Sequence, residues 1–68
     1  MKSNKLDIWH TAAALVTEHG RDAAFVAALR ADTLLAQYDV DGHLTWKRIR
    51  KAIRELHRAT PKSGEWVN

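Results

Sequence analysis

Residues 22–38 read DAAFVAALRADTLLAQY, and this stretch decides the fold. When its residues are placed about 100° apart, as in a helix, only the line of Arg30, Thr33 and Gln37 is fully polar. A helix that is apolar on most of its sides is usually packed between other helices. We therefore expect a central helix over 22–38, with Asp22 as its N-cap.

Two amphipathic segments flank this stretch in the sequence. Over residues 4–19 the apolar side chains gather on one helical face, and Gly20 follows as a stop signal, because glycine adopts the left-handed conformation at little cost. A third helix is predicted over 46–59, after Thr45 as N-cap and before Pro61, which cannot continue a helix. Its apolar stripe consists of Trp46, Ile49, Ile53 and Leu56.

The turn before the third helix is predicted at residues 39–42. Gly42 is expected to supply a positive φ there. Leu44 and Ile49 have the spacing of a hydrophobic staple around the predicted cap. The fold class that follows is all-α: a compact three-helix bundle of about 4–19, 22–38 and 46–59, in a single domain over 1–68 with a short tail at 61–68.

Length and composition restrict how this domain is stabilised and where it works. The chain has 68 residues and no cysteine, so it must depend on helix packing or on association with another chain. The first apolar segment is interrupted by Asp7 and His10, so no signal peptide is expected. No apolar run approaches the roughly 18 residues that span a membrane. We expect a cytoplasmic protein.

Four short motifs lie along about two thirds of the chain. They are HGxDA at 19–23, AxxADxLL at 28–35, DxxG at 39–42 and WxxIxxAIxxL at 46–56. In these motifs the stretch from Ala13 to Leu56 resembles a family of short, functionally uncharacterised bacterial proteins. The resemblance implies a compact helical domain without an assigned activity, and no functional residues carry over from it.

Charge is divided unevenly along the chain. Residues 1–42 carry four basic and six acidic side chains, whereas residues 43–68 carry seven basic and two acidic ones. Six of those basic residues lie on the predicted third helix, mostly opposite its apolar stripe. This pattern predicts a partner-binding surface, to which the tail adds one tryptophan as a possible anchor. The predicted residues are Lys47, Arg48, Arg50, Lys51, Arg54, Arg58 and Trp66.

A solvated helix face is the alternative interpretation of the same charges. Two details favour binding. Lys47 and Arg48 stand in the first turn of the predicted helix, where the helix dipole disfavours cations. Only Glu55 is placed to compensate, through Lys51 or Arg58.

The partner that best fits this surface is a protein with an acidic surface, because arginine pairs with carboxylates in a bidentate geometry. A nucleic-acid-binding domain is the alternative. The outline resembles a helix-turn-helix, but the predicted turn is long, it contains two acids, and no base-reading Asn or Gln lies on the basic helix. Membrane binding is not expected, because the core needs the apolar face of that helix. Dimerisation through Trp9 or Trp66 stays open.

Catalytic, cofactor-binding and metal-binding residues are not predicted. The chain contains no nucleophile motif, paired-carboxylate motif or glycine-rich phosphate loop. No two histidines are four residues apart, so a metal site is not expected. Asp32 is expected to be a buried acceptor or a rim residue paired with an arginine. The prediction is a small non-enzymatic binding or regulatory protein.

Overall fold

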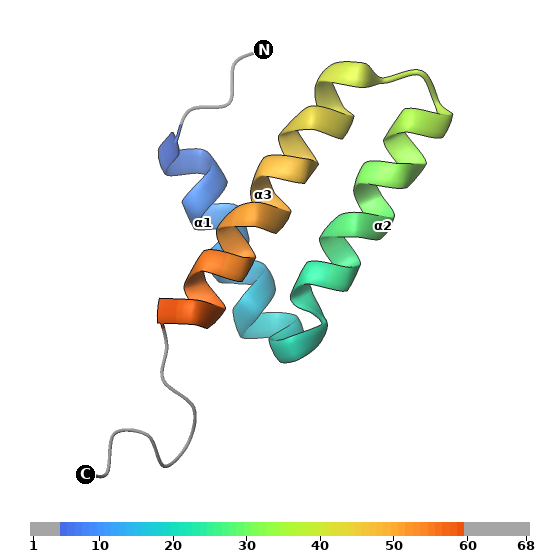
Figure 1. Cartoon of the computed structure of the whole chain (residues 1–68). Helices are drawn as coiled ribbons and strands as arrows, with labels where there is room; N and C mark the ends of the chain where they lie inside the picture. The colour runs from blue at the N-terminus through green and yellow to red at the C-terminus, as the bar shows by residue number, and fades with distance from the viewer. Residues whose placement is uncertain (1–4, 60–68) are drawn as a thin grey trace, which may run out of the picture.

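The computed structural model describes residues 5–59, with side chains over 7–58 (Figure 1). In this range the chain is all-α and has no strand, which confirms the predicted class. Helix α1 (Lys5–His19) continues through the 3-10 turn η1 (Gly20–Asp22) into α2 (Ala23–Ala36), so the backbone forms one long bent helical segment. Helix α3 (Val40–Ala59) is the second segment. The predicted tail at 61–68, including Trp66, lies outside the described residues.

The central helix is α3, and the prediction that residues 22–38 take this place is wrong. Helices α2 and α3 lie side by side and antiparallel, and α1 packs on the other side of α3 (Figure 1). Contacts between α1 and α2 are the fewest of the three helix pairs. As a result, neither of the other two described helices covers the outer side of α2, where Phe25 is 65% and Leu29 50% exposed.

The core is built mainly from alanine. Ala23, Ala27 and Ala31 recur every four residues along α2, so they form one buried stripe on that helix. Small side chains allow helices to approach closely, but each of them buries little apolar surface. Ile53 on α3 is the largest fully buried side chain in the described part of the protein. The remaining buried residues are Ala12, Ile49 and Ala52.

Gly20 ends α1 as predicted, whereas the predicted cap Asp22 makes no side-chain cap bond at the start of α2. Gly20 has a φ of +56°, so it ends α1 in the left-handed conformation that glycine tolerates best. A Cβ at this position would meet no atom within 4 Å. The glycine is therefore required by the backbone conformation and not by a shortage of space.

The turn between α2 and α3 differs from the prediction. At the end of α2 the Tyr38 N–H donates to the Leu35 carbonyl and the Asp39 N–H to the Leu34 carbonyl, each at 2.9 Å. These two bonds define a Schellman motif, in which Tyr38 occupies the left-handed position with φ 62°. The helix was predicted to end at Tyr38, but α2 ends two residues earlier, at Ala36.

Helix α3 begins six residues earlier than predicted, because Asp39 is its N-cap. The Gly42 N–H donates to Asp39 Oδ1 at 2.9 Å, which satisfies one of the free donors of the first turn. Thr45 lies within the helix and is not its cap, so Leu44 and Ile49 form no staple there. Gly42 is helical and not a positive-φ turn residue; a Cβ on it would lie 2.7 Å from Asp39 Oδ2.

Replacing Tyr38 with glycine is expected to stabilise the protein. The left-handed conformation costs a residue with a side chain roughly 1–2 kcal/mol, and Tyr38 is 91% exposed, so little packing is lost. We expect Tyr38→Gly to raise the free energy of unfolding by about 1 kcal/mol in urea denaturation. Tyr38→Ala keeps the Cβ and serves as the control. A glycine variant no more stable than the alanine variant would contradict the expectation.

His43 links the start of α3 to α2. Its Nδ1 lies 2.7 Å from the carbonyl oxygen of Ala31, and the side chain is half-buried. Because a carbonyl only accepts, the Nδ1 atom must carry the proton. This bond holds the two helices together beside the turn.

Candidate partner-binding surface

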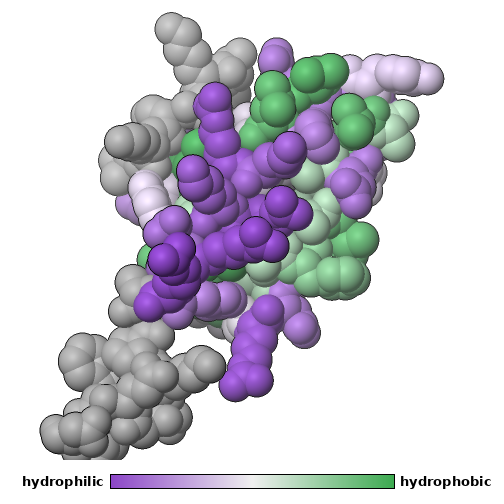
Figure 2. All heavy atoms as spheres, in the orientation of Figure 1, coloured by the Kyte–Doolittle hydropathy of each residue, from purple (hydrophilic) through white to green (hydrophobic). Residues whose placement is uncertain are grey.

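The predicted basic residues lie together on the outer face of α3. We call the exposed line of Lys47, Lys51, Arg54 and Arg58 the basic ridge. Arg48 is exposed on one flank of the ridge, and Arg50 is half-buried on the other. In Figure 2 hydrophilic side chains cover the region of α3, beside a hydrophobic region over α2. The helical spacing therefore places these side chains on one surface.

Among residues 7–58 the basic side chains of this surface have no ion-pair partners. Across residues 7–58 an ion pair joins His19 and Glu18 (Nε2–Oε1 3.8 Å), and none of the six basic residues of α3 takes part in one. The compensation expected from Glu55 is therefore not formed within this range. Helix α3 carries a net formal charge of +4.

One of the two arguments for binding does not hold. Because α3 begins at Val40, Lys47 and Arg48 stand two turns inside the helix and not in its first turn. The helix dipole acts mainly within the first and last turns, so it does not disfavour these cations. The first turn instead contains Asp41, which follows the Asp39 cap. An acidic side chain is favourable there, because the N-terminal end of the helix dipole is positive.

A shallow hollow of about 450 Å³ lies along the ridge. Leu44, which is 46% exposed, lines the hollow together with five basic side chains. Guanidinium groups pair with carboxylates through two parallel hydrogen bonds. The lining thus combines one apolar side chain with several donors for acidic groups. Its basic residues are Lys47, Arg48, Arg50, Lys51 and Arg54.

A second hollow, of about 300 Å³, lies between α1 and α3. Ile8 and Trp9 of α1 and Ala52 of α3 form its apolar lining. Trp9 is 39% exposed, so it lies at the edge of the core and not within it. The rim is made by Arg48, Lys51 and Glu55.

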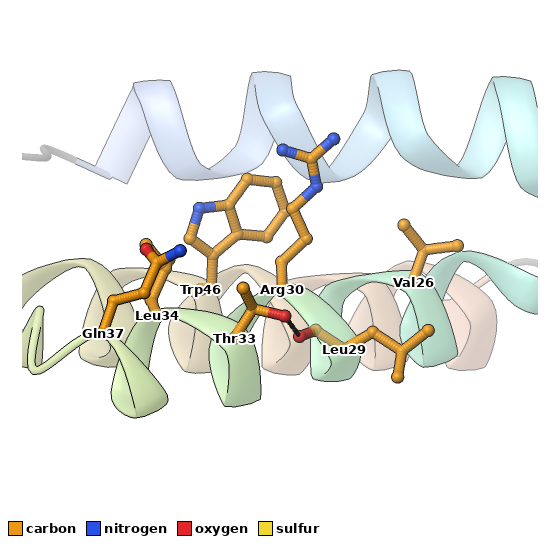
Figure 3. Close-up of a pocket in the computed structure, with 7 residues that line it drawn as sticks. All are labelled: Val26, Leu29, Arg30, Thr33, Leu34, Gln37 and Trp46. Carbon is orange, nitrogen blue, oxygen red and sulfur yellow. Dashed lines mark hydrogen bonds between the residues drawn. The ribbon is translucent and has the colours of Figure 1, made fainter.

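A third hollow, of about 510 Å³, lies along α2 and was not predicted (Figure 3). The Trp46 ring and the Arg30 side chain point toward α1, and the Arg30 guanidinium carbon lies 5.3 Å from the ring centroid. Thr33 donates to the Leu29 carbonyl at 2.9 Å, so its hydroxyl is satisfied within α2. The polar line of Arg30, Thr33 and Gln37 had indicated only a solvated face. Val26, Leu29 and Leu34 complete the lining.

The side chains considered for chemistry are dispersed. Asp32 is exposed, so its predicted role as a buried acceptor is wrong, and within residues 7–58 it forms no ion pair with an arginine. His10, His19 and His57 are exposed on different turns. In the described part of the chain no three His, Cys, Asp or Glu residues are grouped as a metal site would require. None of the described helices combines the length and apolar character needed to cross a bilayer.

Three features of α2 and α3 bear on nucleic-acid binding. Their connection is only three residues, 37–39, so the objection that the turn is too long for a helix-turn-helix is wrong. The helices, however, lie antiparallel side by side and do not cross at the wide angle of that motif (Figure 1). The acids Asp39 and Asp41 also stand at the N-terminal end of α3, the end that enters the major groove in such proteins.

No protein-family model matches the chain, and comparisons with curated proteins and with solved structures also find no match. The resemblance to a family of short bacterial proteins stays a prediction. The function proposed below therefore rests on the surface of α3.

Proposed function

We propose that the chain is a small non-enzymatic binding or regulatory protein of the cytoplasm. In this proposal residues 5–59 act as one compact three-helix bundle, which docks the basic ridge onto an acidic surface of a partner protein. One observation carries the proposal: six basic side chains share the outer part of α3, and none of them is ion-paired within residues 7–58.

Charge and chemistry both favour an acidic protein surface. Like charges on adjacent turns of a helix repel, and carboxylates from a partner relieve that repulsion. Complementary charge also accelerates association and excludes basic partners. Leu44 adds an apolar contact among the cations, which a protein surface matches better than a phosphate backbone does.

Salt titration distinguishes a protein partner from nucleic acid. The probes are a Glu-rich peptide and a mixed-sequence DNA duplex, each with a fluorescent label. We expect the peptide to bind at about 50 mM salt and to lose affinity less steeply than the duplex as salt rises to about 200 mM, because duplex binding releases condensed counterions. Binding of the duplex alone would favour the nucleic-acid alternative. Binding of neither probe would contradict both functions.

Charge reversal tests the ridge itself. Lys51→Glu with Arg54→Glu removes two attractions and adds two repulsions at the centre of the ridge. We expect the affinity for the Glu-rich peptide to fall by about 100-fold, measured by fluorescence anisotropy. Both side chains are exposed, so the circular dichroism spectrum should not change.

Arg21→Glu is the matched control for a single reversal, because Arg21 is exposed in η1 and lies outside the ridge. It should weaken binding far less than Lys51→Glu, although both variants change the net charge equally. Equal losses would mean that the peptide responds to overall charge, and the ridge would not be a specific surface.

A further inference from the structure

The hollow between α1 and α3 differs in chemistry from the ridge beside it. Its inner surface is apolar, because Ile8, Trp9 and Ala52 form it, and its volume of about 300 Å³ is at the lower limit of pockets that hold drug-sized ligands. A partly exposed tryptophan in the lining of a concave site is typical of interface hot spots. The hollow therefore suits one bulky apolar side chain better than an extended ligand.

This hollow adjoins the hollow along the basic ridge. Arg48 and Lys51 line both of them, so two cations stand between an apolar recess on one side and a row of further cations on the other. Among the described residues Glu55 is the one acidic side chain in either lining, and it belongs to the α1–α3 hollow. A ligand that occupies both hollows must therefore be apolar at one point and acidic next to it.

We propose that the hollow between α1 and α3 is a specificity pocket for an acidic peptide segment with one bulky apolar residue. The apolar side chain enters beside Trp9, and carboxylates adjoining it in the partner pair with Arg48 and Lys51. This inference rests on the proposed function, since it names the chemistry of the partner that the basic ridge binds. The pocket requires an apolar side chain in the partner, which the charge of the ridge alone does not require.

Two peptides test the pocket directly. Both are Glu-rich and of equal charge; one carries a central Phe and the other has Ser in its place. In calorimetric titration at about 50 mM salt, we expect the Phe peptide to bind at least about tenfold more tightly, because a bulky aromatic side chain becomes buried. Trp9→Ala should abolish this difference.

Phe25→Ala is the matched control. It also removes an exposed aromatic side chain, but from α2, and Phe25 lines neither hollow. The preference for the Phe peptide should persist in this variant. If Trp9→Ala does not fold, amide chemical shifts of the unmodified protein provide the test. The Phe peptide should then shift the signals of Ile8, Trp9 and Ala52 more than the Ser peptide does.

The outcomes separate the two proposals. Equal affinity of the two peptides for the unmodified protein would overturn the pocket and leave the basic ridge as the binding surface. A preference for the Phe peptide that persists in Trp9→Ala would place the apolar contact elsewhere and overturn the pocket. Amide chemical-shift changes confined to α2 would do the same. Failure of both peptides to bind would contradict the proposed function together with the pocket.

Discussion

Ile53→Ala is expected to lower the free energy of unfolding by about 3 kcal/mol, the largest loss from any single truncation in the core. Ile53 is fully buried in α3, the helix that both other helices contact. The rest of the buried core is mostly alanine, so few neighbouring methyl groups can move to fill the cavity. Thermal unfolding should show a midpoint roughly 12–24 °C lower, because each kcal/mol shifts the midpoint by about 4–8 °C in a domain of this size.

Leu29→Ala is the control for this prediction, because it also removes a branched aliphatic side chain but at a site that is 50% exposed. It should cost less than about 1 kcal/mol. Similar losses in the two variants would mean that the outer face of α2 is covered in solution, for example by a second copy of the chain. That result would contradict the core described for residues 5–59.

Ala27→Leu is expected to destabilise the protein by about 2–3 kcal/mol through overpacking. Ala27 is fully buried in the middle of the alanine stripe of α2, and the contacts of α2 are mainly with α3. A leucine there must separate the two helices or adopt a strained rotamer. Urea denaturation would measure the loss, and the far-ultraviolet circular dichroism of the folded state should stay helical.

Ala36→Leu provides the matched control, because Ala36 is exposed near the end of the same helix and the two residue types differ little in helix propensity. Its stability should change by less than about 0.5 kcal/mol. Equal stability of Ala27→Leu and Ala36→Leu would contradict this prediction. It would mean that α2 and α3 are not closely packed at the alanine stripe.

The positions of the helices were predictable from the sequence, whereas the end of α2 and the start of α3 were not. Apolar periodicity located all three helices, and Gly20 marked the end of α1, because both signals are local. The start of α3 was misplaced because Asp39 and Thr45 are both good caps in isolation. Which of the two caps the helix depends on the Schellman motif at Tyr38. Tyrosine is not a residue type from which a left-handed conformation is predicted.

The candidate surface was predictable because helical spacing is also a local signal. The residues of the basic ridge are spaced three or four apart, so any helix that contains them places them on one face. The hollow beside Trp9 was not predictable, because its lining comes from α1 and α3, which are far apart in the sequence. The sequence contained no signal for the hollow along α2 beyond the three polar residues that were interpreted as solvated.

The sequence by itself determined that this protein is helical and that its positive charge follows one helix. Those properties arise from residues one to four positions apart, which the geometry of a helix brings together. Only the tertiary structure decided that α3 is central and that α2 keeps an apolar outer face. The identity of the central helix depends on which helix faces pair with one another, and an almost uniformly apolar helix such as α2 does not specify which of its sides will be covered.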